Sequence, residues 1–168
     1  MKNKNSKHSE ASLNISEIRY RRLFETAQDG ILILDAETGQ ITDVNPFLVE
    51  MLGYSYEDLL GKKLWEIGCF KDIEASKSAF AKLQGKGYVR FEDLPLETKD
   101  GRPIAVEFVS NVYLVNHQKV IQCNIRDISE RKLLAEALQK AHNELEQRVQ
   151  ERTVELRMAN EQLEEEIK

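Results

Sequence analysis

The side chains best suited to chemistry in this sequence are two thiols and three imidazoles, which could ligate a metal, act as thiolates or accept a phosphoryl group. Cys69 and Cys123 each stand alone, without a second cysteine at the spacing of a zinc site, and two thiols are too few for a disulfide framework. We expect both to be reduced core thiols of a cytoplasmic protein. His8, His117 and His142 are also scattered along the chain, so the sequence predicts no metal site.

Motifs of known catalytic chemistry are missing as well. The sequence has no glycine-rich phosphate loop and no Ser, His and Asp order with supporting glycines. His142 is the candidate phosphoacceptor, but no nucleotide-binding domain follows it before Lys168. We expect His142 to be a solvent-exposed residue beside an apolar helical stripe. No catalytic residue is predicted, and the chain is not expected to be an enzyme by itself.

The composition indicates one globular domain with an additional elongated or exposed part. Of the 168 residues, 41% are hydrophobic and 32% are charged, which is more charge than a compact domain needs. A net charge of −5 argues against a nucleic-acid partner. Residues 1–15 are polar, are expected to be disordered and lack the apolar stretch of a signal peptide. Because no run of about 18 apolar residues occurs, we expect no membrane span and a cytoplasmic location.

The pattern over residues 16–127 predicts an α+β domain with a five-stranded antiparallel sheet and flanking helices. Ser16 is expected to cap a first helix over 16–28. Asn45-Pro46 and Ser55 are strong signals for the start of two short helices. A longer helix is expected over 72–84, ended by the glycines that follow it. The strands are predicted at residues 31–35, 41–44, 88–98, 104–115 and 120–126.

Residues 128–168 contain neither Gly nor Pro and predict one long coiled-coil helix. Apolar residues recur every three or four positions with charges between them. The step from Leu145 to Val149 is a stutter, where the supercoil should unwind locally. Because a lone helix would leave this stripe in water, we expect a homodimer, the alternative being a solvated single helix or one folded back on the domain. The predicted dimer seam consists of Leu134, Leu138, Ala141, Leu145, Val149, Leu156 and Leu163.

Seven short strings follow one another in a characteristic order between residues 16 and 130. They include Asp29-Gly30-Ile31, Val44-Asn45-Pro46-Phe47, Leu52-Gly53-Tyr54-Ser55 and Arg126-Asp127-Ile128-Ser129. Together they resemble the PAS, or S-box, family of sensory domains. The resemblance implies a module that senses a small ligand, the redox state or a partner and passes the signal along the C-terminal helix to a kinase or other output domain. The alternative is the N-terminal sensory fragment of a histidine kinase in a two-component phosphorelay.

The same resemblance implies a ligand pocket between the helices and the sheet. Haem needs an axial ligand, and the helix at 72–84, where haem-binding relatives commonly supply a histidine, contains none. The photoactive flavin subclass needs a cysteine in a motif whose counterpart here, residues 61–66, has none. The cofactor is therefore unknown, with haem and the flavin adduct disfavoured, and non-covalent flavin or a small organic acid left open. The candidate pocket residues, which alternatively only pack against one another, are Phe47, Met51, Trp65, Phe80, Phe91 and Phe108.

The end of the last strand and the start of the long helix are separated by almost no chain. Asp127 can accept hydrogen bonds from the first backbone N–H groups of a helix, and Glu130, three residues later, can reach back. A displacement of the strand would then pass directly to the helix. We predict that Asp127, Ser129 and Glu130 transmit the signal, the alternative being that Asp127 only caps the helix.

Overall fold

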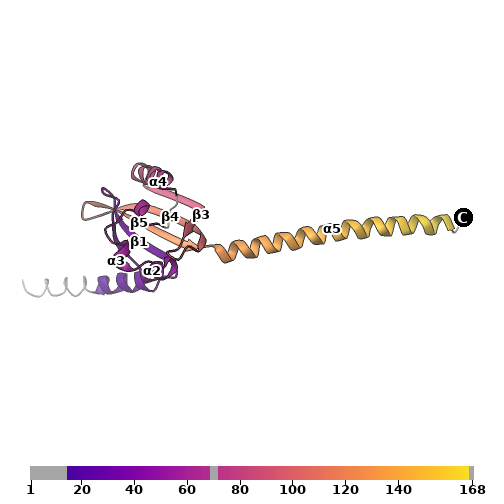
Figure 1. Ribbon diagram of the computed structural model, residues 1–168, viewed down its shortest axis with the longest axis horizontal. Helices are drawn as coiled ribbons and strands as arrows, with labels where there is room; N and C mark the ends of the chain where they lie inside the picture. Colours follow the sequence, from indigo (N-terminus) through magenta and orange to yellow (C-terminus); the bar gives the residue numbers. More distant parts are fainter. Residues whose placement is uncertain (1–14, 69–71, 167–168) are drawn as a thin grey trace, which may run out of the picture. The chain divides into compact units, whose positions relative to one another are not determined.

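The computed structural model describes residues 15–68 and 72–166, and it divides the chain into two compact units, Met1–Ile128 and Ser129–Lys168. A helix over residues 15–25 comes first. The elements after it are β1 (Gly30–Asp35), β2 (Ile41–Val44), α2 (Pro46–Leu52), α3 (Tyr56–Leu59), the 3-10 helix η1 (Leu64–Glu66), α4 (Ile73–Lys86), β3 (Tyr88–Glu97), β4 (Pro103–Val115), β5 (Gln118–Asp127) and α5 (Ser129–Glu166) (Figure 1).

The five strands form one antiparallel sheet in the order β2-β1-β5-β4-β3, which confirms the predicted fold class. The last strand in sequence, β5, therefore lies in the middle of the sheet, between β1 and β4. Its register places Cys123 opposite Ser110 of β4 and opposite Leu32 of β1. Any shift of β5 is thus coupled to both halves of the sheet.

Short-range signals in the sequence account for the helix starts. Asn45 caps α2 by accepting a hydrogen bond from the Leu48 N–H at 3.1 Å, and Pro46 occupies the first helical turn. Ser55 and Asp58 form the reciprocal capping box of α3. Gly53 ends α2 with φ +74°, a left-handed conformation that glycine adopts without steric cost. The predicted starts of the two short helices are confirmed.

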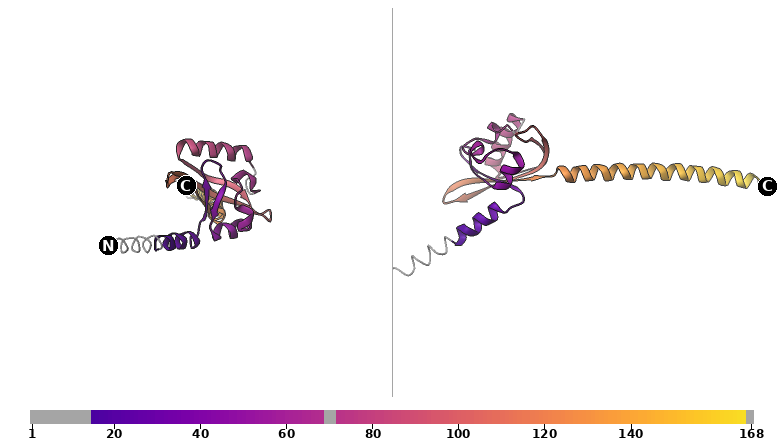
Figure 2. Two further views of the ribbon diagram at one scale, coloured as in Figure 1. Left: turned by 90° about the vertical axis from the view of Figure 1, so that its left-hand side faces the viewer. Right: turned by 60° about the horizontal axis from the view of Figure 1, so that its bottom comes forward.

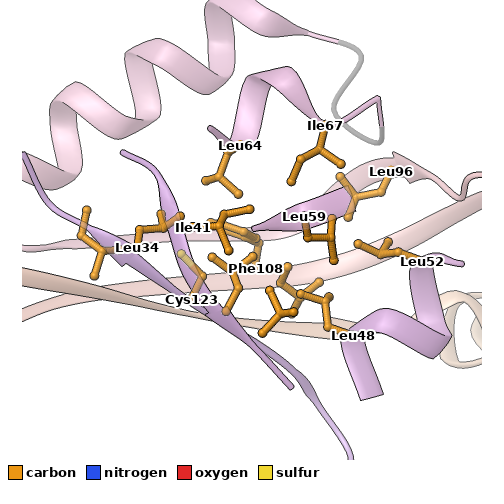
Figure 3. Close-up of a cluster of buried hydrophobic side chains, with 14 of the residues drawn as sticks. Leu34, Ile41, Leu48, Leu52, Leu59, Leu64, Ile67, Leu96, Phe108 and Cys123 are labelled. Atoms are coloured by element: carbon orange, nitrogen blue, oxygen red, sulfur yellow. The ribbon is translucent and has the colours of Figure 1, made fainter. Parts of the chain in front are cut away.

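One apolar cluster joins the helices to one face of the sheet. Inward side chains of the strands pack against Leu48 and Leu52 of α2, Leu59 of α3 and Leu64 of η1 (Figure 3). Leu83 of α4 belongs to the same cluster. The helix over residues 15–25 lies at the opposite end of this unit from α4 (Figures 1 and 2).

The predicted limits of two helices were wrong. The first helix ends at residue 25 instead of 28, and it already includes Ser16, so Ser16 does not precede it. Helix α4 runs through Gly85 to Lys86 and ends only before Gly87, at φ +75°. Strand β3 keeps Pro95 paired with Ala105, which is possible because β3 is an edge strand whose outer N–H positions need no partner.

Three predictions fall on residues outside the described ranges. These are the disorder of the first residues, 1–14; the state of Cys69; and the last turn of the long helix at 167–168.

Candidate functional site: a cavity beside the central sheet

A cavity of about 290 Å³ lies between α4 and the β3–β4 part of the sheet. Its wall is almost entirely apolar, and the polar side chains in it are those of Asp72, Ser76 and Ser110. Ser76 donates its hydroxyl proton to the backbone carbonyl of Asp72 at 2.8 Å. The described lining residues are Leu64, Asp72, Ser76, Ala79, Phe80, Leu83, Val89, Phe91, Leu94, Pro95, Phe108 and Ser110.

Three of the predicted aromatic residues line this cavity. The rings of Phe91 and Phe108 lie 6.4 Å apart, and Phe80 faces them from α4. Trp65 stands behind Phe80 in an edge-to-face contact, with ring centroids 5.6 Å apart. An aromatic wall of this kind offers a large apolar contact area with fixed geometry.

The other two predicted residues lie elsewhere. Phe47 is half-buried on α2, and Met51, on the same helix, packs against the core and borders a separate polar hollow near Lys99. Neither is among the residues that line the 290 Å³ cavity. The structure thus groups Phe80, Phe91 and Phe108 and separates them from Phe47 and Met51.

The sequence analysis missed Ser110, a fully buried hydroxyl at the cavity wall. Ser110 donates a hydrogen bond to the Cys123 Sγ at 2.8 Å. Burial raises the pKa of the Cys123 thiol to about 12, so this thiol stays protonated at neutral pH and is a poor nucleophile. The signal for Ser110 was present, because it is the polar member of the alternating inward set Val106, Phe108 and Ser110 on β4.

A bulge in β3 shapes the cavity. The register of β3 against β4 shifts between Phe91 and Leu94. In a regular strand, residues three apart face opposite sides of the sheet, whereas a bulge brings them to the same side. Phe91 and Leu94 both line the cavity for this reason.

Asn45 connects three elements of the same unit. Its side-chain oxygen accepts from the N–H groups of Ile31 at 2.8 Å and Leu48 at 3.1 Å. Its amide nitrogen donates to the carbonyls of Phe24 at 3.2 Å and Asp29 at 2.9 Å. The end of the first helix, the start of β1 and the start of α2 are therefore held by one fully buried side chain.

An ion pair connects Asp29, whose carbonyl is hydrogen-bonded to Asn45, with the end of β5. Arg126 donates two hydrogen bonds to the Asp29 carboxylate, at 2.9 and 2.6 Å. These bonds hold the pKa of the Asp29 carboxyl below its usual value. Asp127 pairs with Val106 in the sheet, and the Ile128 N–H donates to the Ala105 carbonyl at 2.8 Å, so backbone hydrogen bonding to β4 continues up to the residue before α5.

Helix α5, described by itself, carries its apolar stripe on the surface. Every residue of the seam predicted from the sequence is exposed, including Leu138 at 73% and Leu156 at 63%. The polar faces carry pairs such as His142–Glu146 and Arg152–Glu155. Across residues 15–68 and 72–166, no helix combines the length and the apolar character needed to cross a membrane.

Comparisons with known proteins begin with a PAS domain profile, which matches residues 18–84. Two curated relatives also resemble the chain over most of its length. The chain is 31% identical to the methyl sulfide methyltransferase-associated sensor of Methanosarcina acetivorans over 72% of this chain and 12% of that protein. It is 27% identical to sporulation kinase E of Bacillus subtilis over 80% of this chain and 18% of that protein. The chain thus spans less than a fifth of the length of these relatives.

Solved structures show the same architecture. The PAS domain of an HTR-like protein from Haloarcula marismortui has a TM-score of 0.62 and 28% identity, covering 73% of this chain and 99% of that one. A domain of a sensory box sensor histidine kinase/response regulator from Geobacter sulfurreducens has a TM-score of 0.56 and 28% identity, covering 67% of this chain and 95% of that one.

Proposed function

Because the chain contains a PAS domain related to those of sensor histidine kinases, followed by a long C-terminal helix, we propose that it is a dimeric sensory module. In this proposal the cavity beside α4 takes a small ligand and β5 passes the resulting change to α5. Two α5 helices then carry it to a signalling output partner. We expect the module to act in the cytoplasm, where an unpaired thiol such as that of Cys123 persists.

The observation that carries the proposal is the exposed apolar stripe of α5. From Leu134 to Val149 its residues recur at three- and four-residue steps, and Leu156 and Leu163 continue the stripe at seven-residue steps. None of the 38 residues of α5 is buried. Burying one leucine removes it from water with a gain of roughly 2 kcal/mol, so a stripe of this length strongly favours pairing. Parallel pairing would bring each stripe residue against its copy in the other protomer.

The link between sensing and output rests on β5. This strand lies in the middle of the sheet, pairs with β4 through Ser110 opposite Cys123, and ends one residue before α5. A ligand that moved the cavity wall at Ser110 would act on β5 through a direct strand neighbour. Asp127, Ser129 and Glu130 are then the residues through which the motion enters α5.

A second candidate is that this chain is the sensory part of a histidine kinase. What favours it is the similarity to sporulation kinase E, of which the chain covers 18%. Both candidates share the paired helix and differ in whether the output domain is covalently attached.

Cysteine cross-linking tests the paired helix. In a Cys69→Ser background, Leu138→Cys should form a disulfide-linked dimer under mild oxidation, because a parallel in-register seam places the two copies close enough for a disulfide. Lys140→Cys, two residues further along α5 and therefore on the opposite side of the helix, is the matched control and should remain largely monomeric. Equal cross-linking at both positions, or none at Leu138→Cys, would refute the parallel seam. Cys123 can stay, because its buried thiol is protonated and unreactive.

A further inference from the structure

The cavity wall contains a buried hydroxyl that donates one hydrogen bond and, among the described residues, accepts none. Ser110 is fully buried and donates its proton to Cys123. Among residues 15–68 and 72–166, this is the hydrogen bond that the hydroxyl makes, and its oxygen can accept further bonds. Ser76, the other hydroxyl of the wall, is only half-buried, so water can complete its hydrogen bonds.

The size of the cavity limits what it can hold. A cavity of about 150 Å³ lined by aliphatic and aromatic side chains accommodates one benzene molecule. At about 290 Å³, this cavity has room for roughly twice that volume. The volume therefore fits a molecule of about two fused six-membered rings, at the lower end of the range for ligand pockets.

The charge of the wall limits the ligand further. None of the described lining residues is basic, and the one charged side chain, Asp72, is acidic. An anionic group placed among Phe80, Phe91 and Phe108 would lose its hydration, and no basic side chain among the described lining residues would offset this loss, which is strongly unfavourable. A ligand without negative charge meets no such penalty.

We propose that this cavity takes an uncharged, mainly apolar molecule about the size of two fused rings that donates one hydrogen bond to Ser110 Oγ. The inference rests on the proposed sensory function and specifies the ligand of its cavity. Of the two ligand classes left open by the sequence, it excludes the small organic acids, which are anionic at neutral pH.

Three probes on one scaffold test the proposal: 2-naphthol, naphthalene and 2-naphthoate, titrated calorimetrically into the full chain at pH 7. We expect 2-naphthol to bind more tightly than naphthalene, and 2-naphthoate not to bind. Ser110→Ala should weaken 2-naphthol binding about 2- to 12-fold, which corresponds to one net hydrogen bond, and leave naphthalene unchanged. The matched control, Ser76→Ala, should preserve the preference for 2-naphthol.

A second pair of variants locates the binding site. Ala79 lines the cavity, whereas Ala81, on the same helix, is exposed. Ala79→Phe should fill the space and abolish 2-naphthol binding, and Ala81→Phe should leave it intact, with circular dichroism confirming that both variants fold.

Each contrary result overturns a stated part of the inference. Binding of 2-naphthoate as tight as that of 2-naphthol would refute the charge argument. If the preference for 2-naphthol over naphthalene is lost in Ser76→Ala instead of Ser110→Ala, the proposed hydrogen bond to Ser110 Oγ is refuted. Absence of 2-naphthol binding up to its solubility limit would refute the ligand class. The cross-linking of α5 is measured without ligand. A wrong ligand class would therefore abolish 2-naphthol binding but not the cross-linking, whereas a wrong dimeric module would abolish the cross-linking.

Discussion

Replacing Asn45 by alanine should remove the four side-chain hydrogen bonds that hold together the first helix, β1 and α2 in the unit that contains the sheet (the sheet domain, up to Ile128). The side chain is fully buried and makes four hydrogen bonds, to the N–H groups of Ile31 and Leu48 and to the carbonyls of Phe24 and Asp29. Losing the N-cap of α2 costs about 1 kcal/mol. Leaving the other three backbone groups without this partner costs at least about 1 kcal/mol each. The free energy of unfolding should therefore fall by roughly 4 kcal/mol.

The matched control is Ser55→Ala, since Ser55 is also an N-cap. Its hydrogen bond to the Asp58 N–H is exposed, so water can replace the lost oxygen. We expect a loss of about 1 kcal/mol for this variant. A native domain has only about 5–15 kcal/mol of stability, so the two variants should be easy to distinguish.

Urea unfolding followed by the fluorescence of Trp65 is the appropriate assay. Trp65 is the only tryptophan, and it packs against Phe80 in the sheet domain, so its signal reports this unit and not α5. The variants are compared at one protomer concentration, because association adds to apparent stability. A loss for Asn45→Ala no larger than that for Ser55→Ala would refute the reasoning that the four hydrogen bonds of Asn45 are a buried, cooperative set.

Three further predictions concern charged groups. In the folded protein the Asp29 pKa lies below its ordinary value of 3.8. The pair of Asp29 with Arg126 therefore stabilises the fold fully above pH 3.8, and this contribution is lost as the pH falls through the lowered pKa of the folded state. Arg126→Gln should reduce the dependence of the free energy of unfolding on acid pH by at most about 1 kcal/mol. The Asp58 carboxyl, held by Lys99, has a pKa of about 2. In Lys99→Gln, an NMR titration should show that pKa rising without reaching 3.8, since the Ser55 N–H still donates to the carboxylate. Asp127→Ala should lower the free energy of unfolding by about 1 kcal/mol. It should also reduce the change that 2-naphthol causes in the distance between spin labels on the paired α5 helices. If this change in distance is reduced only in proportion to the loss of stability, Asp127 is a helix cap alone.

Features governed by near neighbours in sequence could be predicted. As helix caps, Asn45-Pro46, Ser55 with Asp58, and Gly53 each act through backbone groups within four residues. The helices start at the first two as expected, and α2 ends at Gly53. The turn at Asn116 and His117 is equally local, although both residues adopt positive φ, at 47° and 67°. The alternation of buried residues along β4 is also a local feature, and it puts Val106, Phe108 and Ser110 on the same face.

The cavity could not be derived in the same way, because it depends on how separate elements meet. Phe47 and Phe80 are equally apolar in the sequence, yet only Phe80 belongs to a helix that faces the β3–β4 side. The bulge between Phe91 and Leu94 leaves no clear mark in the residue pattern, although it decides which side chains of β3 reach the cavity. Ser110 was visible as an inward polar residue, but its importance depends on an empty space beside it.

Signal transfer from the cavity to an output partner depends on two protomers pairing through α5, and the mass of the intact chain in solution tests this pairing directly. Multi-angle light scattering at micromolar concentration should give the mass of two protomers of 19.4 kDa each. A mass of one protomer under these conditions would contradict the paired helix and, with it, the proposed route from the cavity to the output partner.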